Sequence, residues 1–134
     1  MNIEAFLLCD AATDSNGKLN VLGAFDSIFV KTLPTTHPQC AVALRMRLAR
    51  SEQGEHKIAL HFVDEDGQYI VAPLEGGFRV SGGGDATSAS NLILNIQGLR
   101  LARYGEHAIN LIIDGQHVAS LPLFIRSPPS RDLN

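Results

Sequence analysis

Apolar and polar residues alternate along most of this chain, and turns containing glycine separate the alternating runs. Residues 40–48 carry an apolar side chain at every second position, and residues 56–63 repeat this pattern. A period of two with one apolar face predicts a strand that buries one side against a core. We therefore expect antiparallel strands around a core that includes Leu44, Phe62 and Leu111.

Two turns can be tested for register from the sequence. A loop of three residues after Asp64, with Gly67 in the left-handed conformation, pairs Phe62 with Ile70 on one face. In the last hairpin, a loop over residues 114–116 sets Ile109 opposite Leu121, and a bulge would have the same effect.

This register of the last hairpin also concerns two histidines. It directs His107 and His117 toward the core, near opposite ends of the hairpin. We interpret each as a partly buried, hydrogen-bonded side chain, with a shared metal site as the alternative.

The remaining pattern indicates further strands and several loops. Strands are expected at residues 3–12, 19–23, 25–30, 75–80, 91–97, 106–113 and 117–125, and loops at residues 32–39, 81–90 and 98–105. Eight or nine strands at regular spacing favour an all-β, immunoglobulin-like antiparallel β-sandwich. We expect one domain over residues 1–126 and a disordered C-terminal tail over residues 127–134.

One predicted sheet face stands out as a candidate interface. If strands 40–48 and 56–63 pair, their outward residues form a flat patch that is partly ringed by cations. We interpret it as a solvated face, a docking surface for a partner or second subunit, or a phosphate or nucleic-acid site. The candidate interface residues are Ala41, Ala43, Arg45, Arg47, Lys57, Ala59 and His61.

Composition narrows the function classes. The chain has 134 residues with a net charge of −3, and it lacks the basic excess that is typical of nucleic-acid binders. We see no secretory signal and no apolar run of about 20 residues that would span a membrane. A cytoplasmic location without membrane contact is therefore expected.

Cysteines and acidic residues offer the next candidate chemistry. Cys9 and Cys40 lie among apolar residues, so we expect free core thiols, with a disulfide or a reactive thiol as alternatives. The acidic turn of Asp64, Glu65 and Asp66 could ligate a hard cation, but Asp and Gly also suit a tight turn without any ligand.

Motifs for catalysis and cofactor binding are missing from the sequence. It has no Gly-x-Ser-x-Gly elbow, and the glycines at positions 82–84 lack the Lys and Ser/Thr of a phosphate loop. We therefore predict no catalytic residues and no cofactor.

Two resemblances add to this interpretation. The segment from Tyr104 to Leu111, followed by Asp114-Gly115, resembles the closing hairpin of immunoglobulin-like sandwiches, with His107 where the corner tyrosine would lie. A second set of segments occurs in a fixed order: Leu8-Cys9-Asp10-Ala11-Ala12, Gly17-Lys18-Leu19-Asn20, Leu22-Gly23-Ala24-Phe25-Asp26, Leu33-Pro34, His37-Pro38-Gln39-Cys40 and Phe62-Val63-Asp64-Glu65-Asp66-Gly67.

This order resembles a family of small bacterial proteins, domain of unknown function 6941, over about residues 3–125. The resemblance implies a compact bacterial β domain and no particular activity or cofactor. Our leading hypothesis is a non-enzymatic cytoplasmic module for binding or assembly, with a protein partner or a second copy of itself. It would act through the candidate interface or the loop at residues 81–90. The alternatives are a carbohydrate- or metal-binding module at a loop end and a hydrolase.

Overall fold

The computed structural model describes residues 1–129, which form nine strands and one short helical turn. The first sheet contains β1 (Asn2–Ser15), β2 (Lys18–Ala24), β4 (Thr35–Ala49) and β7 (Thr87–Leu101). The second sheet contains β3 (Ser27–Phe29), β5 (Gly54–Val63), β6 (Leu74–Val80), β8 (Gly105–Ile113) and β9 (Gln116–Arg126). The helical turn η1 (Arg50–Glu52) connects β4 to β5.

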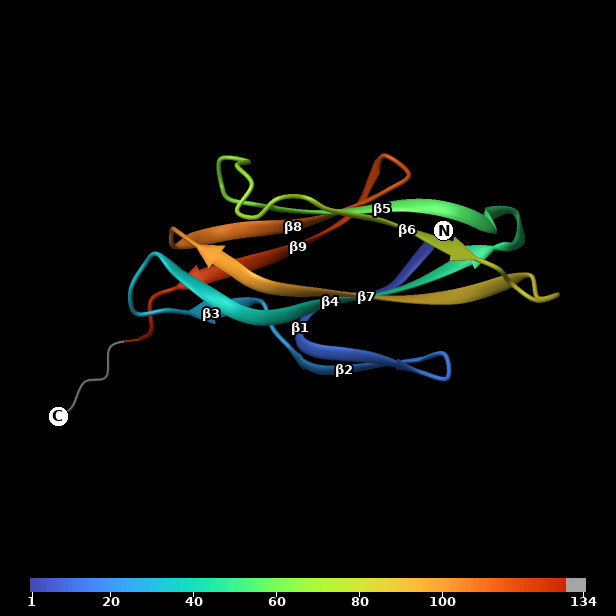
Figure 1. Ribbon diagram of the computed structural model, residues 1–134, viewed down its shortest axis with the longest axis horizontal. Helices are drawn as coiled ribbons and strands as arrows, with labels where there is room; N and C mark the ends of the chain where they lie inside the picture. Colours follow the sequence, from blue (N-terminus) through green and yellow to red (C-terminus); the bar gives the residue numbers. More distant parts are fainter. Residues whose placement is uncertain (130–134) are drawn as a thin grey trace.

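The two sheets pack face to face as a β-sandwich (Figure 1). The strand orders are β2-β1-β4-β7 in the first sheet and β3-β9-β8-β5-β6 in the second. Neighbouring strands run antiparallel, apart from β3, which pairs in parallel with β9. The predicted all-β sandwich is confirmed, while its immunoglobulin-like character stays a prediction.

The core lies between the sheets, where the alternating pattern places the apolar side chains. Leu44, Phe62 and Leu111 are fully buried there, as predicted. Each of these side chains comes from a strand with one apolar face, so the period of two was enough to identify the buried side. No helix within residues 1–129 is long and apolar enough to cross a membrane.

The hairpin formed by the second half of β1 and by β2 covers the outer face of the other two strands of the first sheet, β4 and β7 (Figure 1). The first half of β1 pairs with β4, while its second half pairs with β2, and Cys9 has partners in both. Figure 1 shows the resulting β1–β2 hairpin on the far side of β4 and β7 from the second sheet. A small apolar cluster fills the space beneath the hairpin: Cys9, Ala41 and Ala43, packed by Ala12, Leu19, Val21 and Ile93.

The two cysteines lie on opposite faces of the first sheet. Cys9 belongs to the cluster beneath the hairpin, and Cys40 points into the main core. Both are buried and free, which confirms the predicted core thiols and contradicts the alternative of a disulfide. Burial raises the pKa of the Cys40 thiol to about 11 and also raises that of Cys9, so neither is a ready nucleophile.

The register at the acidic turn is confirmed. The Ile70 amide donates to the Phe62 carbonyl at 2.9 Å, and the Asp64 amide donates to the Gln68 carbonyl at 2.9 Å. Gly67 has a φ of 79°, the left-handed conformation that this turn requires.

The loop of the last hairpin differs from the prediction. Asp114 and Gly115, with φ values of 51° and 80°, form a two-residue turn between β8 and β9. A bulge after Leu111 then restores the predicted pairing of Ile109 with Leu121. The predicted loop of three residues was wrong because the bulge, rather than the turn, takes up the extra residue.

Three predicted loops are shorter than the sequence suggested. β4 begins at Thr35, within the predicted loop 32–39, and β7 covers both the end of loop 81–90 and the start of connection 98–105. Pairing with β4 along its whole length orders the small polar residues of β7, which composition alone assigned to loops. In the predicted tail, residues 127–129 lie outside any strand, and residues 130–134 lie outside the described part of the chain.

Candidate functional site

The seven candidate interface residues do not form one patch. The predicted pairing of strands 40–48 and 56–63 is wrong, because β4 and β5 belong to different sheets and η1 carries the chain from one to the other. Ala41 and Ala43 are fully buried beneath the β1–β2 hairpin. Arg45 and Arg47 lie on the same face of β4, and the other three residues lie on the second sheet: Lys57, Ala59 and His61.

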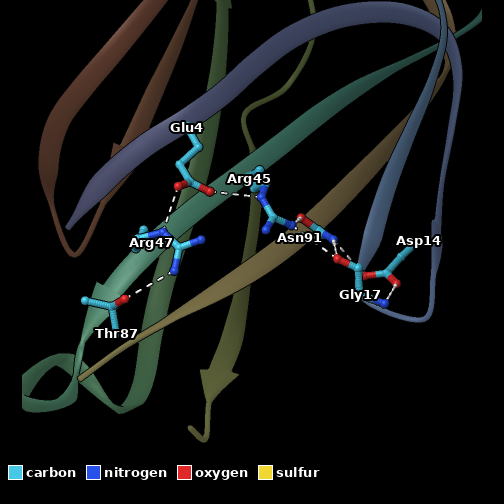
Figure 2. A network of polar contacts seen from close by, with 7 residues as sticks. All are labelled: Glu4, Asp14, Gly17, Arg45, Arg47, Thr87 and Asn91. Atoms are coloured by element: carbon cyan, nitrogen blue, oxygen red, sulfur yellow. Dashed lines mark hydrogen bonds and ion pairs between the residues drawn. The ribbon is translucent and has the colours of Figure 1, made fainter. Parts of the chain in front are cut away.

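Arg45 holds three neighbouring segments together (Figure 2). Its Nε donates to Oε1 of Glu4 in β1 at 2.9 Å. Its Nη1 donates to Oδ1 of Asn91 in β7 at 3.0 Å and to the carbonyl of Gly17 at the hairpin tip at 3.2 Å. The guanidinium therefore contacts this chain's own groups on several sides.

Arg47 binds the other oxygen of the same carboxylate. Its Nε donates to Oε2 of Glu4 at 2.7 Å, and its Nη1 donates to Oγ1 of Thr87 at 3.2 Å. The hydrogen bond from Arg47, assisted by Arg45, lowers the pKa of the Glu4 carboxyl, and Glu4 in turn raises the pKa of Arg47. One carboxylate thus bridges both arginines.

Asn91 completes what we call the tether network. Its Nδ2 donates to Oδ2 of Asp14 and to the Gly17 carbonyl, both at 3.1 Å, while the Gly17 amide donates to Oδ1 of Asp14 at 3.0 Å. The hairpin tip is therefore fixed against the outer face of β7 (Figure 2). The tether network consists of Glu4, Asp14, Gly17, Arg45, Arg47, Thr87 and Asn91.

The three candidate residues on the second sheet border an open hollow of about 1020 Å³. Its floor includes residues with small side chains or none: Ala59, Gly76 and Gly77. The His61 ring meets the Tyr69 ring edge-on, with 5.2 Å between the ring centroids. This hollow is a second exposed surface, separate from the tether network.

The acidic turn is occupied by the protein's own groups. Asp64 accepts hydrogen bonds at Oδ1 from the amides of Asp66 and Gln68, both at 2.9 Å. Arg103 pairs with Asp64 at 2.5 Å and with Asp66 at 3.0 Å, and its hydrogen bond lowers the pKa of the Asp64 carboxyl. Glu65 accepts from the Glu106 amide. These contacts favour the structural interpretation of the turn, and residues 1–129 contain no cluster of three metal-ligating side chains.

The two histidines of the last hairpin lie on different faces. His107 is buried, with Nδ1 at 3.2 Å from the Gly105 carbonyl, in line with the prediction. His117 is exposed and lies 2.9 Å from Oγ of Ser120, so its predicted inward position was wrong. The bulge after Leu111 pairs His117 with an outward position of β8, Ile112, and this reverses its face.

A second hollow brings Asp10, Ser27 and His37 to one rim. Ser27 donates to Oδ1 of Asp26 at 2.9 Å and accepts from Nε of Arg126 at 3.2 Å. Within residues 1–129, no hydrogen bond joins Ser27 to His37. The rim therefore lacks the nucleophile–base contact on which serine hydrolases depend.

The feature that sequence reasoning missed is the free edge of β7. This strand of 15 residues ends the first sheet, and within residues 1–129 its only strand neighbour is β4. From Thr87 to Leu99 it contains no charged residue and no proline, the usual devices that protect an edge. The other terminal strands, β2, β3 and β6, are shorter than β7, and β2 also carries Lys18.

The direction of the free backbone groups follows from the register. Just beyond the end of the β4–β7 ladder, the Arg50 amide donates to the Ala86 carbonyl at 3.1 Å, in the same register as the ladder pair Ala49 and Thr87, so 50 and 86 are a pair of the hydrogen-bonded kind. In an antiparallel ladder, pairs of this kind alternate with pairs that share no hydrogen bond. The even-numbered residues of β7 therefore direct their N–H and C=O groups toward β4. The odd-numbered residues from Ala89 to Gln97 therefore direct their N–H and C=O groups outward. We call this row the β7 edge: residues 89, 91, 93, 95 and 97.

Comparisons with known proteins identify a family and similar solved structures. The model of a family described as "Family of unknown function (DUF6941)" matches residues 4–126. A structure of a Pseudomonas fluorescens alkylpurine DNA glycosylase, AlkC, bound to DNA containing an abasic site analog, is similar over 94% of this chain, with 10% identity and a TM-score of 0.49. This chain spans 30% of the glycosylase chain. No curated protein matches the sequence.

Proposed function

The chain belongs to DUF6941, a family of unknown function, and we propose that it is a non-enzymatic binding and assembly module that accepts an extended protein strand at the β7 edge. The unprotected edge is the observation that carries this proposal. Free backbone donors and acceptors in a row are a template for strand addition. The two unpaired thiols fit a reducing compartment, so we propose the bacterial cytoplasm as its location.

The side chains of β7 also suit an added strand. Leu92 and Leu94 point toward the core but remain partly exposed at the end of the sheet. A neighbouring strand would cover these apolar surfaces while it satisfied the backbone groups beside them. Asn95 and Gln97 are exposed and uncharged, so they present no charge barrier to an approaching strand.

Arg45 and Arg47 support the β7 edge and do not themselves form a second binding surface. Arg45 and Arg47 already hold Glu4, Asn91 and Thr87, and a partner that recruited them would have to break these bonds. Their contacts to Asn91 and Thr87 instead hold β7 in place. The tether network therefore makes the edge a rigid template, which lowers the entropic cost of binding.

Site-specific photo-crosslinking tests the proposal in cells. A photoreactive phenylalanine derivative at position 97 reports on the β7 edge, and the same residue at position 57 reports on the hollow of the second sheet. We expect a defined protein crosslink from position 97. Crosslinks from position 57 alone would contradict the edge as the binding surface and favour the sheet face.

A variant that removes one backbone N–H group of the β7 edge provides a second test of the proposal. Asn95→Pro removes an N–H group that points outward, whereas that residue makes no ladder bond to β4. We expect the position-97 crosslink to disappear in this variant. Asn95→Ala, which keeps the N–H group, is the matched control and should retain it. A crosslink that persists in Asn95→Pro would overturn the proposal.

A further inference from the structure

The strand that this edge accepts can be identified from β7 itself. Resting on the proposed function, we infer that the partner is β7 of a second copy of this chain, paired antiparallel across a two-fold axis at Ile93. The two first sheets would then join into one continuous sheet. Such a contact is isologous, because each copy offers the same edge to the other.

The order of side chains around Ile93 supports a partner with the same sequence. Residues 91–95 read Asn-Leu-Ile-Leu-Asn, which is the same in both directions. An antiparallel pairing centred on Ile93 therefore matches Ile93 with Ile93, Leu92 with Leu94 and Asn91 with Asn95 of the second copy. Leucines meet leucines on the core side, and amides meet amides on the outer side.

The hydrogen-bond pattern of β7 also places the two-fold axis at Ile93. Two-fold pairing through a hydrogen-bonded pair requires a central residue whose N–H and C=O groups point outward. Ile93 is such a residue, because the bond from Arg50 to Ala86 continues the register of the β4–β7 ladder, and this register directs the backbone groups of the even-numbered residues toward β4. The pairing would form about ten backbone hydrogen bonds between the two copies over residues 89–97.

Charge does not oppose this association. In the inferred register, Ala89 faces Gln97 of the second copy, and no charged residue of β7 lies between these positions. The centre of the edge is also braced from within each copy. The Asn91 side chain is bound by Asp14, Gly17 and Arg45 on the outer face, while its backbone groups remain directed toward the partner.

A matched pair of double variants tests both the partner and the register. In A89E/Q97E, the inferred register places two like-charged pairs across the axis. In A89E/Q97K, the same positions carry two pairs of opposite charge. Both positions are exposed, and the shared Glu at position 89 keeps its relation to Arg47 of β4 constant.

The measurement is sedimentation equilibrium of the purified chain, with circular dichroism to confirm folding. We expect the wild type and A89E/Q97K to form dimers and A89E/Q97E to dissociate with a dimer Kd at least about 10-fold higher. The charge effect should shrink in high salt. Equal dimer affinities of the two double variants would overturn the inferred register.

The outcomes separate this inference from the proposed function. A wild-type chain that stays monomeric at about 100 µM would overturn self-association. If position 97 nevertheless crosslinks to a different protein in cells, the β7 edge binds a foreign strand and the proposed function stands. A monomer without any crosslink at position 97 would overturn both.

Discussion

The Nδ1 atom of His56 in β5 lies 2.6 Å from Oδ2 of Asp114 in the turn between β8 and β9. The other ring nitrogen of His56, Nε2, lies 2.5 Å from the Glu52 carbonyl oxygen. Both neighbours accept hydrogen bonds, so the ring satisfies them together only when it carries both protons. The bond with Asp114, followed by that with Glu52, therefore raises the pKa of His56 above its ordinary value of 6.5.

The first prediction concerns the pH dependence of stability. Because the pKa of His56 is raised in the folded state, its contribution is fully present below about pH 6.5 and is lost as pH rises through the higher folded value. His56→Gln should remove this dependence. We expect the urea midpoint of the wild type to exceed that of the variant by more at about pH 6 than at about pH 8.5. A difference that stays constant over this range would contradict the charged pair.

The second prediction concerns how the hairpin is held. Arg45→Ala removes the bond to Gly17 at the hairpin tip as well as the bonds to Asn91 in β7 and to Glu4, whereas Arg47→Ala removes only bonds to Glu4 and Thr87. Amide hydrogen exchange over residues 11–22 should therefore become faster in Arg45→Ala and change little in Arg47→Ala. The same rates in both variants would show that Arg45 does not hold the hairpin.

The third prediction concerns the core. Leu44 is fully buried, and Leu44→Ala should lower the free energy of unfolding by about 2–5 kcal/mol, because it removes apolar contacts and leaves a cavity. Leu22 is 70% exposed, so Leu22→Ala is the control and should change it by less than about 0.5 kcal/mol. Denaturant unfolding of both variants measures this difference, and a small effect at Leu44 would contradict the sandwich core.

The fourth prediction concerns the acidic turn. Since Arg103 and backbone amides already satisfy Asp64, we expect neither calcium nor EDTA to move the thermal midpoint. Asp64→Asn should lower the midpoint, while Asp66→Asn should have a smaller effect, because the Asp66 side chain is 67% exposed. The lowered pKa of Asp64 adds stability above its ordinary value of 3.8, which is lost as pH falls. A midpoint that rises with calcium in the wild type, but not in Asp64→Asn, would identify a cation site instead.

Local pattern was enough for those features that depend on neighbouring residues. The pairing of Phe62 with Ile70 followed from one turn and one apolar face, because a slip by one residue would expose the whole buried set. The pairing of Ile109 with Leu121 followed in the same way, although the structure reaches it through a bulge. His117 shows the limit of this reasoning, since one bulge reversed its face.

The candidate interface failed as a single patch for a non-local reason. Strands that follow each other in sequence pair often, so residues 40–48 and 56–63 were expected to be neighbours. The chain instead crosses to the second sheet at η1, and β4 pairs with β7, far along the sequence. Ala43 and Arg45 then meet the β1–β2 hairpin. The position of this hairpin depends on the change of partner of β1 from β4 to β2 at Cys9, which no periodic pattern encodes.

By itself, the sequence determined the all-β class, the central part of most strands, which of their sides are apolar and which family the chain resembles. These properties follow from side-chain alternation, turn chemistry and order along the chain. Only the tertiary structure decided that Ala41 and Ala43 are buried, that Arg45 and Asp64 have partners within the protein and that β7 ends its sheet. Those outcomes depend on contacts between distant segments, and the free energy of such contacts comes from packing that a local pattern does not contain.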